Sequence, residues 1–491
     1  MYPAAPATAR TLERGHQHRA QSPAAYDLIA IGSGPAGQRA AVQAAKLGRH
    51  TAIVDRPTAF GGTSTNTGTV PSKALRAAVV ELTGIAHGTE RAAYRIKDRI
   101  TIDDLLWRAH EVIRQERQVI DDQLSRNGVD VLPGTASFLD PHTVEITTAS
   151  AIDQVRAESF VIAVGARPAR PQGVDFDGHT VLDSDGILGL AAVPRTLTVV
   201  GAGVIGLEYA SILAAVGTTV TVVDKRDRIL DFVDAEVAAA LQYHLRDLGV
   251  VFRLGEEVQS VKRRAGGAVT ELRSGKRIPS DVVLYAAGRH GATDGLNLAA
   301  IGLEADHRGN LAVGPDYRTA QPHIFAAGDV IGFPSLAATS MEQGRLAALA
   351  ALSEPAHALP ALLPYGIYTI PEISYVGLNE DELTRQAVPY VVGVARYREL
   401  VRGAISGDRT GVLKLVVHAG TSRVLGVHIF GTSATELIHI GQTVMAADLP
   451  LGYLVDAVFN VPTFADAYKV AALDAANRLN EIAGRTGAVS A

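Results

Sequence analysis

The 491-residue sequence contains no cysteine. The chain can therefore form no disulfide, no thiolate–metal site and no thiol nucleophile. It also lacks any apolar run of the roughly 18–20 residues that a membrane-spanning helix needs. Its formal net charge of −5 provides no basic surface for nucleic acid. These absences exclude thiol chemistry and favour a cytoplasmic protein that binds neither nucleic acid nor membrane.

The chain is too long for one hydrophobic core, and its 47 % apolar residues suffice for several packed domains. Residues 1–25 contain no apolar segment typical of a signal peptide and are predicted to form a mobile tail. His16 and His18 lie in this tail without a third ligand nearby, so no metal site is predicted.

A strand–turn–helix–strand pattern begins at residue 27. Residues 27–31 form a short apolar run, typical of a buried parallel strand, and a glycine-rich turn at 32–37 follows directly. An alanine-rich helical run over 38–47 leads to a second strand at 51–54, which ends in Asp55. This is the dinucleotide-binding fingerprint of a βαβ unit.

The three glycines of the turn have separate roles in this fingerprint. Gly32 allows the tight turn, Gly34 lets the backbone approach a pyrophosphate, and Gly37 lets the helix pack closely on the strand. The helix N-terminus faces the phosphates, and Asp55 accepts hydrogen bonds from a ribose diol. A glycine-rich turn alone is weak evidence, and the complete unit is what predicts a dinucleotide.

The same unit recurs later in the chain. A strand at 198–200 leads into the turn 201–206, a helical run follows at 207–216, and a strand at 219–223 ends in Asp224. From the first glycine to the acidic residue, both units span 23 positions. Two matched fingerprints predict two dinucleotides bound by two related domains.

Between the units, residues 61–73 read Gly-Gly-Thr-Ser-Thr-Asn-Thr-Gly-Thr-Val-Pro-Ser-Lys and open a helical run over 73–82. A longer helical run is predicted at 102–124, and β-like pieces are predicted at 129–132, 144–146 and 159–165. The proline-rich stretch Arg167–Pro171 is interpreted as a linker.

After the second unit, the sequence predicts further ligand-binding positions and then a part with a different pattern of strands and helices. A strand at 282–285 runs toward Gly288, and Asp329 lies just past the C-terminal end of a strand, where α/β sheets bind ligands. Antiparallel strands are predicted at 364–376, 390–396, 412–418 and 424–430, with helices at 435–447 and 465–479. His418, His428 and His439 in this part are interpreted as packing or surface residues.

Nearly the whole chain after residue 26 resembles the pyridine nucleotide–disulfide oxidoreductases, and within them the soluble transhydrogenase branch. The match rests on the stretches 68–76, 320–337, 366–374 and 459–468. The resemblance implies an α/β fold with two Rossmann-like domains and an α+β dimerisation domain, and hence a homodimer or higher homo-oligomer. The expected parts are a tail at 1–25, an FAD domain at 26–170 and 291–360, an NAD(P) domain at 171–290 and an interface domain at 361–491.

The resemblance also carries binding residues over to this sequence. The implied FAD contacts are Gly32, Ser33, Gly34, Gly37, Asp55, Arg56, Gly61, Gly62, Thr63, Ser64, Thr69, Lys73, Ala136, Gly165, Asp329 and Ala337. The implied NAD(P) contacts are Gly201, Gly203, Val204, Ile205, Gly206, Asp224, Lys225, Arg226, Val258 and Gly288. Lys73 is expected beside the flavin ring in an ion pair with Glu208, and these two are the implied catalytic residues. A solvated lysine and an ordinary carboxylate at a helix N-terminus are the alternatives.

The chain departs from the family where the family keeps its thiols. The family carries two cysteines with four residues between them, and the two places here hold Ser64 and Thr69. Transhydrogenases of this branch usually keep the first cysteine. The family's disulfide reductases also use a His–Glu acid–base pair, and its places here hold Val461 and Asp466. A valine transfers no proton, so disulfide chemistry is excluded.

The loop after the second unit indicates which coenzymes bind. Asp224 favours NAD, because a carboxylate accepts a hydrogen bond from the 2′-hydroxyl and repels a 2′-phosphate. Lys225, Arg226 and Arg228 follow directly and attract that phosphate. Both signs side by side suit an enzyme that takes NAD and NADP in turn, although a solvated charged loop has the same composition.

The favoured function is Si-specific NAD(P)⁺ transhydrogenation, in which FAD carries hydride between NADPH and NAD. The first alternative is an NAD(P)H dehydrogenase that reduces a quinone or a dye. It would need an acceptor pocket lined by Ser64, Thr69 and the partner subunit's Val461. The second alternative is a redox-silent flavoprotein that senses nucleotides.

Overall fold

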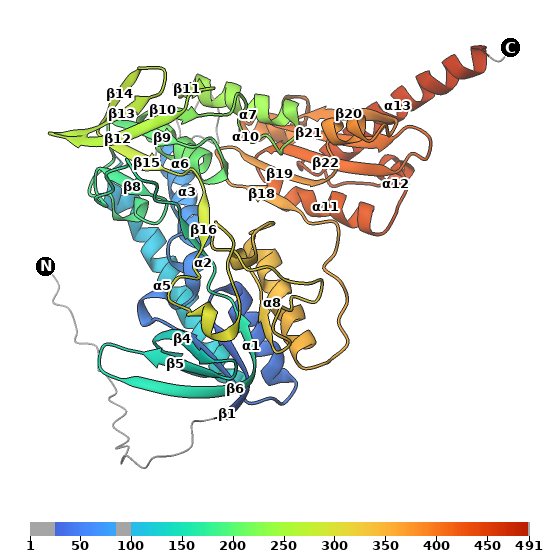
Figure 1. The fold of residues 1–491 in the computed structure, drawn as a ribbon. Helices are drawn as coiled ribbons and strands as arrows, with labels where there is room; N and C mark the ends of the chain where they lie inside the picture. The colour runs from blue at the N-terminus through green and yellow to red at the C-terminus, as the bar shows by residue number, and fades with distance from the viewer. Residues whose placement is uncertain (1–24, 85–99, 490–491) are drawn as a thin grey trace, which may run out of the picture.

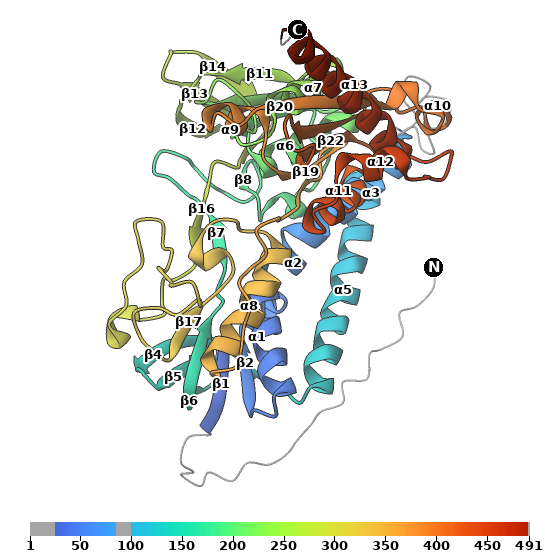
Figure 2. The ribbon, with the colours of Figure 1, turned by 90° about the vertical axis from the view of Figure 1, so that its right-hand side faces the viewer.

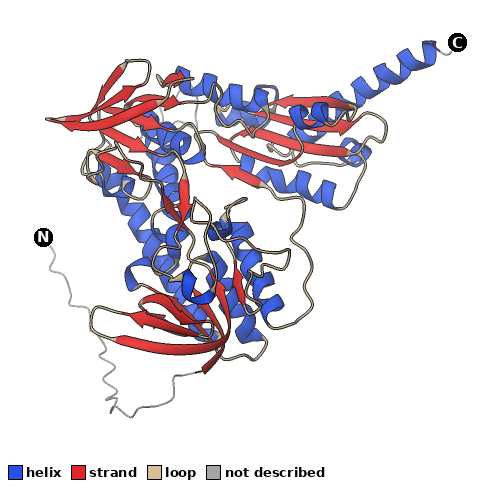
Figure 3. Cartoon of the chain, in the orientation of Figure 1, coloured by secondary structure: helices blue, strands red, loops and turns tan. Residues whose placement is uncertain are grey.

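The computed structural model describes residues 25–84 and 100–489. Residues 1–24 of the predicted tail lie outside the described residues. The chain folds into three bodies, and each is built around one large sheet (Figure 1). Figure 3 shows helices and strands in all three bodies. The predicted α/β fold with two Rossmann-like units and an α+β C-terminal part is confirmed.

The first sheet has seven strands, of which five are parallel. The parallel strands are β1 (Ala25–Ile31), β2 (Thr51–Asp55), β3 (Asp130–Pro133), β6 (Ile152–Ile162) and β17 (Ile324–Ala326), and the antiparallel strands are β4 (Thr135–Asp140) and β5 (Thr143–Thr147). The strand expected at 159–165 is longer and ends earlier, because its first half pairs with β5 and its second half with β1. The late strand β17 pairs with β6, so the chain returns to its first sheet.

Helices α1 (Pro35–Lys46), α5 (Ile102–Arg126) and α8 (Ala337–Ala351) pack on strands of this sheet (Figure 2). The helix α2 (Gly62–Asn66) leads into α3 (Thr69–Thr83), which packs against α5. Helices α1 and α8 touch at Gly344, where any Cβ would overlap the backbone of Ala36. The helix α8 was not predicted from the sequence.

The second sheet has five parallel strands in the order β11-β10-β9-β15-β8. Its strands are β8 (Val181–Asp183), β9 (Thr196–Val200), β10 (Thr219–Asp224), β11 (Val251–Leu254) and β15 (Val282–Tyr285), with helices α6 (Val204–Ala215) and α7 (Ala235–Asp247). A three-stranded antiparallel sheet lies beside it, formed by β12 (Val258–Arg264), β13 (Gly267–Leu272) and β14 (Arg277–Ser280). The sequence analysis predicted neither this small sheet nor α7.

The stretch interpreted as a linker does connect the first two bodies, but two of its residues, Arg167 and Pro168, belong to a strand that the sequence analysis did not predict. These residues lie in β7 (Ala166–Pro168), which pairs antiparallel with β16 (Arg289–Gly291). The chain crosses between the first two bodies once in each direction, and the two crossing segments form a ribbon. The pairing involves residues more than 100 positions apart, which no local pattern reveals.

The third sheet is antiparallel, in the order β18-β19-β22-β21-β20. Its strands are β18 (Tyr365–Ile367), β19 (Glu372–Gly377), β20 (Tyr390–Arg396), β21 (Val412–His418) and β22 (Val424–Gly431), and its helices are α9 (Glu380–Arg385), α10 (Val401–Ser406), α11 (Ala434–Ala446), α12 (Leu451–Asp456) and α13 (Asp466–Val489). The run predicted at 364–376 is a hairpin, because a turn at 368–371 separates β18 from β19. In Figure 1 the end of α13 extends away from the rest of the molecule.

The three histidines of this part have packing or surface positions, as predicted. His428 on β22 is 1 % exposed, and its burial lowers its pKa. The ring of His418 accepts hydrogen bonds from the backbone of the following turn, and His439 contacts Gln442 on the exposed side of α11. Among the described residues, no helix combines the length and apolar character that crossing a bilayer requires.

One hydrophobic core joins all three bodies. It includes Leu75 of α3, Leu105 of α5, Ile212 of α6, Ile367 of β18 and Phe430 of β22. These residues come from the segment after the first glycine-rich turn, from the second sheet's unit and from the third sheet. The cluster fixes the relative positions of the two fingerprints.

A buried charge cluster adds a second connection between the second unit and the third sheet. The ammonium of Lys414 on β21, whose side chain is 2 % exposed, contacts Asp234, Glu236 and Glu380. Asp234 also caps the N-terminus of α7. Burial by itself would lower the pKa of Lys414, but the three carboxylates raise it above its usual value. The three carboxylates therefore favour the charged form of Lys414.

The Lys414→Met variant is expected to be strongly destabilised, because it leaves Asp234 buried without its cation. Removing one partner of a buried ion pair costs about 3–5 kcal/mol. The measurement is the midpoint of thermal unfolding. The matched control is Lys262→Met, which removes an exposed lysine 3.6 Å from Glu271 and is expected to change the midpoint little. Equal midpoints for the two variants would contradict this account.

Candidate functional site

The first glycine-rich turn has the geometry that the fingerprint predicts. Gly32 has a φ of +107°, a conformation that favours glycine. A Cβ at Gly37 would overlap the carbonyl oxygen of Gly32, so helix and strand approach as closely as glycine permits. A Cβ at Gly34 would meet only Gly62, with 3.9 Å to its Cα. The N-terminus of α1 therefore leaves room for a phosphate group beside Gly34.

Asp55 connects three segments around this turn. Its carboxylate accepts hydrogen bonds from the amide and the hydroxyl of Ser33, at 2.8 and 2.6 Å, and from the amide of Arg56 at 2.7 Å. The Ser33 hydroxyl oxygen in turn accepts a 2.8 Å hydrogen bond from the amide of Gly61. The start of the segment 61–73 is thereby fixed against the glycine-rich turn.

The second turn repeats this arrangement. Gly201 has a φ of +111°, and a Cβ at Gly206 would overlap the carbonyl oxygen of Gly201. A Cβ at Gly203 would find no atom within 4 Å, so the N-terminus of α6 faces open space. Asp224 accepts a 2.7 Å hydrogen bond from the amide of Ala202, as Asp55 does from Ser33. Both units thus have an open helix N-terminus of the kind that binds a dinucleotide pyrophosphate.

The segment in place of the family's redox disulfide is held by side chains. Asn66 donates hydrogen bonds to the carbonyl oxygens of Phe60 and Gly62, at 2.9 and 2.7 Å, and accepts one from Arg117 of α5 at 2.8 Å. The hydroxyls of Ser64 and Thr69 have no hydrogen-bond partner among the described residues. The sequence analysis missed Asn66 and Arg117, because their contact joins positions 51 residues apart.

Lys73 and Glu208 form the ion pair that the resemblance implied. The Lys73 ammonium lies 2.9 and 2.8 Å from the two carboxylate oxygens. The Lys73 side chain is 26 % exposed, while that of Glu208 is only 5 % exposed. Glu208 also accepts a 2.9 Å hydrogen bond from the amide of Tyr368, and the ammonium lies 4.7 Å from the centre of the Tyr368 ring. The pair therefore joins α3, α6 and the hairpin turn of the third sheet.

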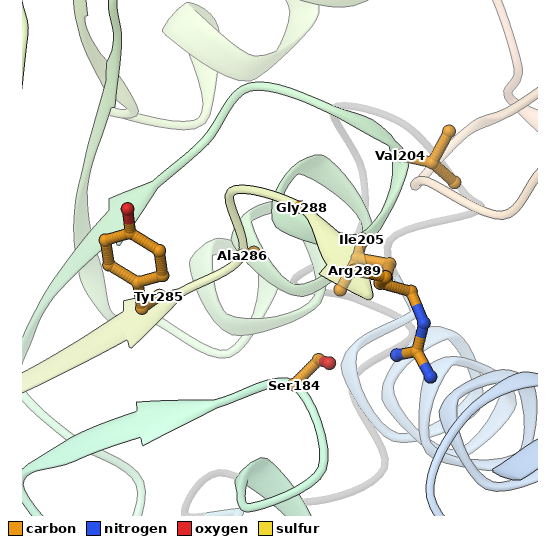
Figure 4. Close-up of a pocket in the computed structure, with 7 residues that line it drawn as sticks. All are labelled: Ser184, Val204, Ile205, Tyr285, Ala286, Gly288 and Arg289. Carbon is orange, nitrogen blue, oxygen red and sulfur yellow. The ribbon is translucent and has the colours of Figure 1, made fainter. Parts of the chain in front are cut away.

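A pocket of about 140 Å³ opens at the edge of the second sheet. Its lining residues are Ser184, Val204, Ile205, Tyr285, Ala286, Gly288 and Arg289. Figure 4 shows Tyr285 and Arg289 at opposite sides, with Ala286 and Gly288 between them. The sequence analysis singled out only the two helix residues and Gly288, since the others become neighbours through the fold.

Asp185 links this pocket to the segment 61–73. It accepts a 3.1 Å hydrogen bond from the Thr67 hydroxyl and lies 3.9 Å from the Arg289 guanidinium. Burial raises the pKa of Asp185, with the charge of Arg289 acting in the opposite direction. Asp185 thus connects Arg289, which lines the pocket, with Thr67 of the segment 61–73.

Asp329 lies three residues beyond β17, in a short turn of helix at Asp329–Ile331. Burial raises its pKa, while Arg289 and a hydrogen bond from Ser340 lower it. The preceding Gly328 amide donates a 2.9 Å hydrogen bond to Gln343 of α8, the helix that begins at Ala337.

The charged loop after β10 is internally paired. Asp224 is buried, and Arg226 contacts it through two guanidinium nitrogens, at 3.1 and 2.8 Å. Burial by itself would raise the pKa of Asp224, but the hydrogen bonds from Arg226 and Ala202 lower it. Lys225 is exposed and makes no ion pair within the described residues. Opposite charges are therefore present as predicted, and Asp224 and Arg226 pair with each other.

Further carried-over residues lie within strands, just after strands or in a helix. Ala136 lies in β4 within a hydrophobic core, and Val258 in β12 packs against another core. Gly165 has a φ of +69° just after β6. Arg56 directly follows β2. Thr63 lies in α2, and its carbonyl oxygen accepts a 2.7 Å hydrogen bond from the amide of Gly68.

Comparison with known proteins identifies the family. Residues 26–344 match the pyridine nucleotide-disulphide oxidoreductase family, and residues 363–472 match its dimerisation domain. The chain belongs to the pyridine nucleotide-disulphide oxidoreductases.

Comparison with individual proteins is more specific than the family match. The chain is 56 % identical over 465 residues to a soluble pyridine nucleotide transhydrogenase of Mycobacterium bovis, covering 93 % of this chain and 98 % of the relative. It is 44 % identical over 460 residues to a soluble pyridine nucleotide transhydrogenase of Pseudomonas aeruginosa, covering 92 % of this chain and 99 % of the relative. Among solved structures it resembles LpdA of Mycobacterium tuberculosis, with a TM-score of 0.83 and 27 % identity over 91 % of this chain and 99 % of the other. A HOCl-induced flavoprotein disulfide reductase of Escherichia coli gives a TM-score of 0.82 at 26 % identity, with the same coverage.

The Glu208→Gln variant is expected to lower the midpoint of thermal unfolding. Glutamine keeps an acceptor for the Tyr368 amide but removes the charge that binds Lys73, at a cost of about 1–3 kcal/mol. The control is Glu111→Gln, which neutralises a carboxylate paired with Arg114 on the solvent side of α5. Equal midpoints for the two variants would show that the buried pair adds nothing to the junction.

Proposed function

We propose that this chain is an FAD-dependent transhydrogenase that transfers hydride between NADPH and NAD. The observation that carries the proposal is the combination of two complete dinucleotide units with a Lys73–Glu208 pair and no thiol anywhere in the chain. The names of the relatives support transhydrogenation over quinone reduction and over a redox-silent flavoprotein. The si stereospecificity remains a prediction.

We assign FAD to the first unit, formed by residues 26–170 and 291–360. The open N-terminus of α1 beside Gly34 fits the pyrophosphate. Asp329 is the proposed partner of the ribityl chain, and its half-buried position past β17 supports that role. The pairing of β17 with β6 supports the inclusion of the second segment in this domain.

We assign NAD(P) to the second unit, residues 171–290. The open N-terminus of α6 at Gly203 suits its pyrophosphate, and Asp224 with the following basic residues is the proposed reader of the 2′ position. The pocket lined by Val204, Ile205 and Gly288 is the proposed place for the nicotinamide end. Its contact with Thr67 through Asp185 supports a position next to the flavin.

Bound FAD supplies the chemistry, since its ring takes up hydride from one nicotinamide and returns it to another. Lys73 provides a fixed positive charge beside the proposed ring position, which favours the negative charge that reduction adds. Glu208 holds that ammonium in place, because a carboxylate so deeply buried requires a cation. No residue need act as a nucleophile or transfer a proton, which agrees with Ser64, Thr69 and Val461 at the family's reactive places.

We propose a homodimer formed through residues 361–491. The matched dimerisation domain supports this assembly. Exposed apolar side chains on this part support it further: Tyr453 is 50 % exposed, Val458 95 % and Val461 63 %. A cytoplasmic location is proposed from the names of the relatives and the absence of cysteine.

The Asp329→Ala variant is expected to bind FAD more weakly. Hydrogen bonds to charged groups contribute roughly 1.5–3 kcal/mol, which corresponds to about a 10- to 150-fold weaker affinity. The measurement is the flavin content after dialysis against a low concentration of free FAD. Asp294→Ala, which removes an exposed carboxylate near Arg167, is the control and is expected to keep its flavin. Full occupancy in the Asp329 variant would exclude this residue as a flavin contact.

Without cysteine, the reduced enzyme is expected to hold two electrons per FAD. Anaerobic NADPH should bleach the flavin absorbance without a thiolate–flavin charge-transfer band, and thiol-alkylating reagents should not change activity. NAD added after removal of NADP should restore the oxidised spectrum within the turnover time. Each coenzyme is expected to inhibit competitively at high concentration, because both use one site. If a quinone reoxidises the flavin far faster than NAD does, the enzyme is a quinone reductase instead.

A further inference from the structure

The loop after β10 contains a carboxylate that the sequence analysis did not consider. Asp231 lies 2.9 Å from Nη1 of Arg226, while the other guanidinium nitrogens of Arg226 contact Asp224. The two carboxylates differ in burial, since the Asp224 side chain is 7 % exposed and that of Asp231 is 52 % exposed. Arg226 is thus held by one buried and one exposed acidic residue.

The backbone of this loop is fixed. The Gly255 amide donates a 2.8 Å hydrogen bond to the Arg226 carbonyl oxygen, and Asp224 is tied to the Ala202 amide. Ile229 and Leu230, which precede Asp231, are almost completely buried. With the backbone anchored at these points, the exposed side chains of the loop are the groups most free to rearrange when a coenzyme binds.

The two contacts of Arg226 differ in how easily they break. The contact with Asp224 uses two hydrogen bonds in a shielded position, whereas an exposed ion pair contributes little and exchanges readily with solvent ions. A 2′-phosphate approaching from solvent would therefore displace Asp231 and take Nη1, while Asp224 keeps the other two nitrogens. Asp231 occupies the donor that this phosphate needs.

The net charge of the loop also indicates that Asp231 weakens binding of the 2′-phosphate. The loop from Asp224 to Asp231 has three acidic and three basic residues, so its formal net charge is zero and offers no excess positive charge to a doubly negative 2′-phosphate. A neutral residue at position 231 would bring this sum to +1 and free one donor. The 2′-hydroxyl of NAD has no charge and does not respond to the change.

We propose that Asp231 is a specificity-determining residue, which weakens binding of the 2′-phosphate and so keeps the affinities for NADP(H) and NAD(H) comparable. The inference rests on the proposed function, because only an enzyme that uses both coenzymes at one site needs such a balance. Strong binding of NADP would slow its release and block the entry of NAD. Asp231 limits that strength without removing the cation that recognises the phosphate.

The experiment measures binding of two probes to the FAD-loaded protein by calorimetry. Adenosine 2′,5′-bisphosphate carries the 2′-phosphate, and adenosine 5′-monophosphate lacks it. The Asp231→Asn variant is expected to bind the bisphosphate roughly three- to tenfold more tightly, with little change for the monophosphate. The gain should shrink as ionic strength rises. Asp231→Glu keeps the charge and should restore the wild-type ratio of affinities.

A matched control changes the charge of the same loop without touching Arg226. Asp227 is exposed and makes no ion pair among the described residues, so Asp227→Asn removes one negative charge that holds no guanidinium. Its ratio of affinities is expected to stay at the wild-type value. An equal gain in both asparagine variants would reduce the effect to general charge and overturn the role of Asp231. An equal gain for both probes, or no gain, in Asp231→Asn would overturn it as well.

Two further results separate this inference from the proposed function. If the wild-type protein binds neither probe, the nucleotide site is misplaced and the inference is overturned with it. If the wild-type protein binds both probes and Asp231→Asn shows the selective gain, but NADPH does not reduce NAD through the enzyme, then the specificity role stands and transhydrogenation fails.

Discussion

The ion pair between Lys73 and Glu208 is the contact on which the arrangement of this molecule depends. Glu208 is buried in the second turn of α6, where an unpaired carboxylate would be costly. Its cation comes from α3 and its second partner is the Tyr368 amide in the third sheet. One carboxylate therefore requires all three bodies to meet at one place, and that place is the gap between the two dinucleotide units.

The two units are built alike but use their acidic residues differently. Asp55 turns back to Ser33 and, through it, to the segment that begins at Gly61. Asp224 instead pairs with Arg226, next to the exposed Asp231. The first arrangement suits a cofactor that stays bound, and the second suits substrates that must be exchanged. The difference lies in the residues around the strand ends and not in the fingerprint itself.

The segment at 61–73 is held by side-chain contacts and contains no disulfide. A network from Asn66 to Arg117 on one side, and from Thr67 to Asp185 on the other, holds it between α5 and the second unit. The segment therefore presents two hydroxyl groups, Ser64 and Thr69, in place of sulfur. We propose that this surface positions the nicotinamide and flavin rings without taking electrons from them.

The sequence by itself determined the two βαβ units, because glycine spacing, strand periodicity and the terminal acidic residue all lie within about 25 positions of each other. It also identified the thiol-free chemistry, and the family resemblance supplied the pairing of Lys73 with Glu208. Only the tertiary structure decided the ribbon of β7 and β16, the network around Asn66 and the sharing of Arg226 between Asp224 and Asp231. Most of these contacts join residues far apart in the chain, and in the Arg226 case local sequence shows charges but not which of them pair. Hydrogen bonds and burial choose among such partners, and both are properties of the folded chain.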